Sequence, residues 1–221
     1  MDPEKRRRLG EYIKARHFEL SACGHISWKV QSLTLKHAAD RLYELYLEAM
    51  NRSFKRISEQ VEKNDGSIGG SRVLEGQELL DFWDESLMPV YFMLMGYSLE
   101  NLLKAILMIQ HPEYFKPNQK LIDLRTHDLV DLCRRCKIKL LQEEANLLRE
   151  LTVFIEWKGK YPIALLSKEM WGKIKEDGTV IPKGAINYKE KQKVESLYIK
   201  FSKELDLIKP AEVELKTPPP F

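Results

Sequence analysis

The chain has 221 residues, of which 43% are hydrophobic and 31% are charged, and its 36 basic and 33 acidic residues leave a formal net charge of +3. This composition is typical of a globular protein with a full core, and so small a net charge does not by itself indicate a nucleic-acid partner. Three cysteines, Cys23, Cys133 and Cys136, exclude the disulfide framework of a small secreted domain. The basic start of the chain is not followed by an apolar run, so we expect no signal peptide and a cytoplasmic protein.

The pattern of apolar residues predicts an all-α protein, an antiparallel bundle of about five helices. We expect this domain to span residues 28–207, with a basic extension over residues 1–27 before it and a flexible tail over residues 208–221 after it. An insertion at about residues 158–186 contains an Asp-Gly turn between two β-compatible runs. That pattern predicts a small hairpin before the last helix.

Two helices are expected before the centre of the chain. The first runs from Trp28 to about Val61, because apolar residues recur on one stripe at helical spacing. The stripe consists of Leu35, Ala38, Leu42, Leu45, Ala49 and Ile57. The turn-rich residues 64–71 end this helix, and a second is expected from about Leu74 to Asp84.

The stretch from Tyr91 to Ile109 is apolar almost all the way round, yet it carries Glu100 and Lys104 one helical turn apart. A helix of this kind belongs in the centre of a protein or in a membrane. Because charged groups are expensive inside a membrane, we predict the central helix of the bundle and no membrane partner. Pro89 is expected to break or kink the chain before this helix. His111 should end it, since the residue before a proline avoids helical geometry.

The second half of the chain predicts three further helices. Thr126 is expected to cap the first of them, with Asp128 in its first turn. The second spans about Leu141 to Trp157 and the third about Asn187 to Leu207. The residues expected to face the core are Leu129, Leu132, Cys133 and Cys136 in the first, Ala145, Leu148, Leu151, Thr152 and Ile155 in the second, and Val194, Leu197, Tyr198, Phe201 and Leu205 in the third.

Three blocks of sequence resemble the signatures of the HEPN superfamily of helical domains. Residues 96–106, GYSLENLLKAI, are similar to its second-helix signature, in which a Glu precedes Lys-Ala. Residues 126–129, THDL, match the start of its short third helix, and residues 157–162, WKGKYP, resemble its Arg-Tyr-Pro turn with Lys160 in place of the arginine. The resemblance covers about residues 28–207. It implies an all-α bundle, often dimeric, in proteins of RNA cleavage, toxin–antitoxin pairs, antiviral defence or nucleotide binding.

Catalytic members of this superfamily use an arginine followed a few residues later by a histidine, and they cleave RNA without a metal. None of the five histidines of this chain follows an arginine at that spacing. The resemblance therefore implies a module without catalysis, cofactor or metal that binds RNA, a nucleotide phosphate or a partner protein. We expect Lys160, Tyr161 and His127 to line its site, with Glu100 and Lys104 supporting them.

Two other functions stay open at this point. One is a metal-independent ribonuclease that uses His127 with Lys160, because metal-free RNA cleavage needs a base that works near neutral pH and imidazole is the usual choice. The other is a purely structural interaction protein, a homodimer joined through faces of the central and last helices.

The supporting residues also have a purely structural interpretation. Glu100 and Lys104 have the spacing and order of a stabilising helical ion pair, and such a pair at the edge of the bundle needs no ligand. His127 at a helix start is more often a packed capping residue than a catalyst. Buried charges must be paired in either case, so only the exposure of these side chains separates the two interpretations.

Two further patterns have alternatives of their own. Cys133 and Cys136 form one CxxC, and Cys23 with His25 would have to complete a zinc site, so two buried thiols are the preferred interpretation. Residues 158–193 are rich in lysine with interleaved aromatics, which suits single-stranded nucleic acid but equally suits a solvated surface. The residues concerned are Lys158, Lys160, Lys168, Lys173, Lys175, Lys183, Lys189, Lys191 and Lys193, with Trp157, Tyr161, Trp171 and Tyr188.

Overall fold

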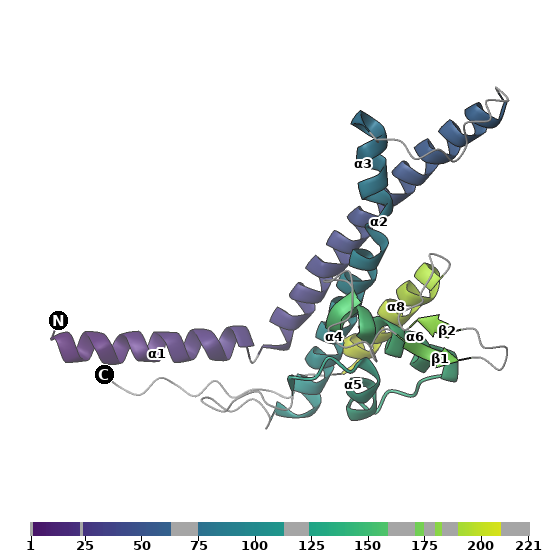
Figure 1. Ribbon diagram of the computed structural model, residues 1–221. Coiled ribbons are helices and arrows are strands. Elements are labelled where there is room, and N and C mark those ends of the chain that lie inside the picture. The colour runs from purple at the N-terminus through teal and green to yellow at the C-terminus, as the bar shows by residue number, and fades with distance from the viewer. Residues whose placement is uncertain are drawn as a thin grey trace.

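The computed structural model describes residues 2–22, 24–62, 75–112, 124–158, 171–174, 180–182 and 190–208. In these residues the protein is all-α apart from one pair of short strands (Figure 1). The helices are α1 (Pro3–Ala22), α2 (His25–Glu62), α3 (Gly76–Glu85), α4 (Met88–Gln110), α5 (Leu129–Arg135), α6 (Gln142–Val153), the π-helix η3 (Phe154–Lys158) and α8 (Lys191–Leu207). The strands β1 (Trp171–Ile174) and β2 (Val180–Pro182) pair antiparallel where the sequence predicts a hairpin.

Helix α4 is the centre of the fold. It packs against α2, α5, α6, η3 and α8, which together form the body of the protein. Helix α1 projects from one side of this body, and the far part of α2 rises from it with α3 alongside (Figure 1). We call α3 and residues 47–62 of α2 the arm.

The central helix predicted from the apolar stretch is confirmed. No described side chain of α4 is exposed, and Tyr91, Leu99 and Leu103 are completely buried. Pro89 lies in the first turn of α4, where its missing N–H leaves no helical hydrogen bond unmade, and the predicted break comes just before it, at the turn of residues 86–87 between α3 and α4. His111 follows the last helical residue, as predicted.

Gly96 lets α4 approach η3 closely. A Cβ atom built at Gly96 would lie 2.7 Å from Cγ1 and 2.9 Å from Cδ1 of Ile155. Those distances are too short for carbon atoms, so the packing of the two helices depends on the absence of a side chain at this position. Ile155 itself is completely buried, as the sequence predicts.

The buried face of α2 differs from the predicted stripe. Ala49 is buried, but Ala38 and Ile57 are exposed, while Ser32 and Ala39 are completely buried. The hydroxyl of Ser32 donates to the carbonyl of Ser98 on α4 at 2.7 Å, and the hydroxyl of Ser98 donates to the carbonyl of Ser32 at 2.8 Å. Small and polar residues therefore make the close contact with α4, which a search for large apolar residues does not find.

The cap of α5 also differs from the prediction. Asp128 is the capping residue, because its Oδ1 accepts hydrogen bonds from the N–H groups of Val130 and Asp131, both at 2.9 Å. Thr126 acts one step earlier, where its Oγ1 accepts from the N–H of Asp128 at 3.0 Å. The short segment before α5 is thus fixed by two side chains, and His127 lies between them.

The other predicted inner faces are confirmed. The buried residues of α5, α6, η3 and α8 include all of the predicted ones except Thr152, which is half-buried. Residues 1–27, for which the sequence predicts only a basic extension, contain α1 and the first turn of α2, so α2 begins at His25 instead of Trp28. The described part of the last helix begins at Lys191, and residues 187–189 lie outside the described residues.

Candidate functional site

Glu100 and Lys104 form an ion pair inside the body, on the side of α4 that faces α2 and the start of α5. Glu100 is 4% exposed and Lys104 is 5% exposed, and the ammonium of Lys104 donates to Oε1 of Glu100. The ammonium also lies over the ring of Trp28 on α2, 5.6 Å from the ring centroid. The pair is buried, so it does not lie at the edge of the bundle, and its charges are balanced by each other and by the aromatic face.

His127 connects this buried pair to the surface. Its Nδ1 lies 2.9 Å from Oε2 of Glu100, and its side chain is 44% exposed, whereas that of Glu100 is 6% exposed. The ring of Tyr97 stands edge-on to the imidazole, with the ring centroids 6.0 Å apart. One carboxylate therefore holds a buried cation with one oxygen and a half-exposed imidazole with the other.

The partners of Glu100 decide which nitrogen of His127 carries a proton. An ionised carboxylate only accepts hydrogen bonds, and Glu100 is ionised because it faces the ammonium of Lys104 at contact distance. Nδ1 of His127 must then be the donor. This leaves Nε2 as the nitrogen for outside groups: it accepts a hydrogen bond when the ring is neutral and donates one when the ring is protonated.

The charge of the cluster follows from the same assignment. Glu100 and Lys104 cancel, so the cluster is neutral with a neutral imidazole and carries one positive charge when His127 is protonated. The exposed Arg125 lies two residues before His127 in the chain. The outward nitrogen of His127 is therefore the group of this cluster that is available to an anion.

The structure brings together three of the five residues predicted for the site: His127, Glu100 and Lys104. The other two, Lys160 and Tyr161, lie outside the described residues. The same holds for the side chains of the lysine-rich segment before residue 190, so the predicted basic surface stays a prediction.

Sequence reasoning missed two members of this cluster, Trp28 and Tyr97. Tyr97 precedes Glu100 by three residues, which places it on the same side of α4, and that spacing was a usable signal. Its hydroxyl donates to the carbonyl of Ile155 at 3.3 Å, which ties the cluster to η3. Trp28 comes from a segment more than seventy residues away, and only the packing of α2 on α4 brings it close.

The two cysteines of the CxxC are buried free thiols, as the preferred interpretation predicts. Burial raises the pKa of the Cys133 thiol to about 12 and raises that of Cys136 further still. Cys23 lies outside the described residues. Across the described part of the chain, no group of three or more His, Cys, Asp or Glu side chains is placed to hold a metal ion.

Two predictions concern what surrounds the central helix: a dimer interface and the absence of a membrane. The dimer interface predicted on faces of the central and last helices stays a prediction; much of the central helix, including Leu99 and Leu103, is buried within one chain. By length and composition alone, the helical stretch Gly76–Gln110 would suffice to cross a membrane, and 72% of its most apolar window is buried inside the protein. Burial of that degree is typical of a core helix.

Comparison with known proteins adds no relative. The sequence matches no family model, and neither the search of curated proteins nor the search of solved structures returned a match.

Proposed function

We propose that the protein is a HEPN-like, non-catalytic helical module that binds a phosphate group of RNA or of a nucleotide at the surface beside His127. In this proposal His127 contacts the phosphate, Glu100 and Lys104 hold His127 from behind, and Lys160 and Tyr161 complete the site. One observation carries the proposal: a half-exposed imidazole is hydrogen-bonded at 2.9 Å to a carboxylate that is almost completely buried.

The Glu100–His127 contact supports binding because it positions the imidazole before any ligand arrives. Nδ1 is occupied by Glu100, so the ring presents Nε2 outward without searching other orientations. A protonated imidazole donates a charge-assisted hydrogen bond to a phosphate oxygen, which is about twice as strong as a neutral one. A histidine that served only to cap α5 would need no buried carboxylate, since Asp128 already makes the cap.

The same contact supports the HEPN resemblance. Glu100 belongs to residues 96–106 and His127 belongs to residues 126–129, which are two of the three blocks that carry the resemblance. Residues that are similar to separate family signatures thus meet at one point, with Glu100 contributed by α4 and His127 by the segment before α5. A shared site is the simplest reason for both signatures to be present.

A ribonuclease is the second candidate, and the same geometry favours it. An imidazole whose Nδ1–H is held by a carboxylate is the arrangement of a general base. Cleavage of a phosphodiester without metal also needs a proton donor for the leaving group. Lys104 does not reach a substrate for this purpose, because it is 5% exposed behind Glu100. The alternative would use Lys160 for this step, and we prefer binding because the chain lacks the arginine-to-histidine spacing of the catalytic family members.

The test is an RNA assay with the purified full chain in EDTA, using labelled single-stranded RNA and tRNA and reading binding and cleavage from the same samples. His127→Ala should weaken binding by roughly tenfold or more, the value of one charge-assisted hydrogen bond. The matched control is His37→Ala, because His37 is an exposed histidine on α2. Lys160→Ala should also weaken binding and reduce its dependence on salt.

Each outcome decides between the candidates. Intact RNA that is bound through His127 supports the proposal. RNA cleaved by the wild type and not by His127→Ala makes the protein a metal-independent ribonuclease. Equal affinity of the wild type and His127→Ala, or no affinity at all, overturns the phosphate site and leaves an interaction protein.

A further inference from the structure

Helix α3 packs its polar side against its own chain and exposes its apolar side. Three of its acidic residues, Glu78, Asp81 and Asp84, face Arg52 and Arg56 on α2, with N···O distances up to 4.0 Å. Asp81 is completely buried in this contact. A surface helix normally buries its apolar side and exposes its charges. These three carboxylates of α3 are instead turned to its own chain.

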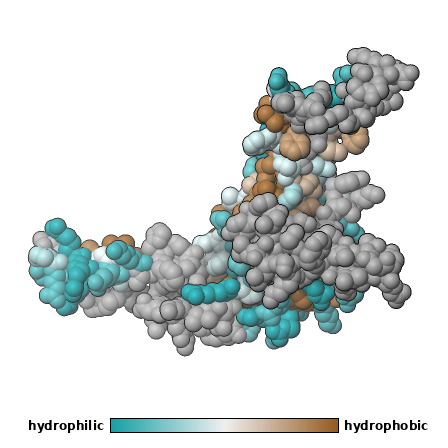
Figure 2. All heavy atoms as spheres, in the orientation of Figure 1, coloured by the Kyte–Doolittle hydropathy of each residue, from teal (hydrophilic) through white to brown (hydrophobic). Residues whose placement is uncertain are grey.

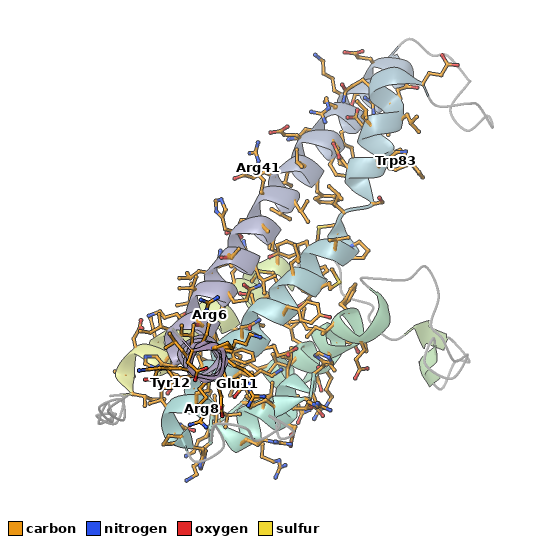
Figure 3. All side chains as sticks on the ribbon, turned by 90° about the vertical axis from the view of Figure 1, so that its left-hand side faces the viewer. Arg6, Arg8, Glu11, Tyr12, Arg41 and Trp83 are labelled. Atoms are coloured by element: carbon orange, nitrogen blue, oxygen red, sulfur yellow. The ribbon has the colours of Figure 1, made fainter. Side chains whose placement is uncertain are left out.

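The apolar side of α3 is left at the surface. Leu79, Leu80, Phe82 and Trp83 are 40%, 58%, 59% and 64% exposed. Figure 3 shows Trp83 on the side of α3 away from α2, and Figure 2 shows apolar residues gathered on the arm. We call these four residues the α3 face. Nothing within the described part of the chain covers it.

We propose that the α3 face is a homodimer interface, in which α3 packs antiparallel against α3 of a second copy across a two-fold axis. The inference goes beyond the phosphate site, because the arm is a different part of the molecule and uses none of the same residues. We assign a second copy of this chain as the partner on three grounds: the charge of the α3 face, its area and the position of the arm.

The charge of the α3 face selects a neutral, apolar partner. Asp81 is completely buried against Arg52 and Arg56, and Glu78 and Asp84 lie within 4.0 Å of the same arginines, so these carboxylates stand on the side of α3 opposite the four apolar residues. A second α3 face is itself neutral and apolar, and a two-fold axis places like against like. Two such faces therefore complement each other without an unpaired charge in the contact.

The area fits a dimer of this size. Four large apolar side chains that are each about half exposed remove on the order of 500 Å² per chain from water, since one aromatic residue alone carries about 150–250 Å². The two copies together then bury about 1,000 Å², which is the lower limit for a specific protein interface. A single exposed patch of this size is also at the upper end of what monomeric proteins show.

The position of the arm allows the contact. The arm rises away from the body, so two arms can lie side by side while the two bodies stay apart (Figure 1). In this contact the two α3 helices lie at the centre, and the α2 helix of each copy lies on the outer side of its own α3.

The chain provides a matched control in Phe54, which is 59% exposed on α2. Phe54 lies two residues from both Arg52 and Arg56, which is about 200° around a helix, so it points away from α3. Phe54→Ser removes as much exposed apolar surface as Phe82→Ser but leaves the α3 face intact. The two variants differ only in which side of the arm they change.

The first measurement is the mass of the full chain in solution at micromolar concentration, by sedimentation or light scattering. The wild type should have twice the 25.9 kDa of one chain. Trp83→Ser and Phe82→Ser should weaken the dimer by roughly tenfold or more each, as is usual for a central aromatic at an interface, and Phe54→Ser should leave it unchanged. Circular dichroism should show the same helix content in all four proteins, because these side chains lie outside the fold.

Cross-linking gives a second, independent reading. In a Cys23→Ser background, in which the described cysteines are buried, at least one of Leu79→Cys, Leu80→Cys and Trp83→Cys, tested singly, should form an intermolecular disulfide under mild oxidation, because a two-fold axis brings the residues beside it within disulfide distance, and Phe54→Cys should not. A wild-type chain that is monomeric at micromolar concentration overturns the proposal. So does a dimer that is insensitive to Trp83→Ser, or one that cross-links equally well through Phe54→Cys.

Discussion

The body and the arm of this protein differ in which side chains they bury: the body buries mainly apolar ones, and helix α3 of the arm buries a charged one. In the body, α4 is surrounded by apolar side chains and admits one buried ion pair, Glu100 with Lys104. In the arm, α3 is attached to α2 through ion pairs around Asp81 and leaves its apolar residues outside. The comparison teaches that a buried charge has different meanings in the two places. In the body it supports a surface histidine, and in the arm it frees an apolar face for another contact.

The largest expected effect comes from breaking the ion pair of the body. Glu100→Ala leaves Lys104 buried without a carboxylate, which should lower the free energy of unfolding by about 3–5 kcal/mol. Urea denaturation followed by circular dichroism measures this. The double variant Glu100→Leu with Lys104→Met, which removes both charges, should recover most of the loss. A single variant as stable as the wild type would show that the ammonium of Lys104 finds water or another partner.

Gly96→Ala should have a smaller effect, because it disturbs packing without stranding a charge. The new methyl group would lie 2.7 Å from Cγ1 of Ile155, so α4 and η3 must separate slightly, at a cost of about 1–3 kcal/mol. Ile155→Ala in the same chain should remove the clash, so the double variant should lose less stability than the two single variants summed. Purely additive losses in the denaturation midpoints would contradict the close contact.

The smallest effect is expected in the arm, and acid should reveal it. Burial by itself raises the pKa of the Asp81 carboxyl, but hydrogen bonds from Arg56, Gln77 and Arg52 outweigh it and hold the pKa at about 2. Because this pKa is depressed, its contribution to stability is present above about pH 4 and is lost as the pH falls toward about 2. The amides of α3 should lose their protection from hydrogen exchange in that window before those of α4.

The control for the acid experiment is Asp81→Asn, which removes the titrating group. Its α3 should be less protected than that of the wild type at pH 6, and it should show no further loss specific to α3 between about pH 4 and pH 2. Simultaneous loss of α3 and α4 protection in the wild type would mean that arm and body unfold as one unit. That result would remove the distinction between the two regions.

Much of the body could be predicted because its signals are local. The apolar stretch around Leu99 and Leu103 and the inner residues of α8 follow from spacing within one helix. The pairing of Glu100 with Lys104 is of this kind, since residues four apart in a helix are neighbours. The errors occurred where a second element decided the outcome. On α2, Ser32 is buried because its hydroxyl donates to the carbonyl of Ser98 and the hydroxyl of Ser98 donates to the carbonyl of Ser32.

The sequence by itself determined that this is an all-α chain with an apolar central helix carrying a polar pair, because helical periodicity and side-chain chemistry are written in neighbouring residues. Only the tertiary structure decided that Glu100 reaches His127, that Trp28 covers Lys104 and that α3 turns its carboxylates inward. These are contacts between segments distant in the chain. The free energy of these contacts depends on which charges and surfaces are buried together when the chain folds. The pattern of neighbouring residues does not contain that information.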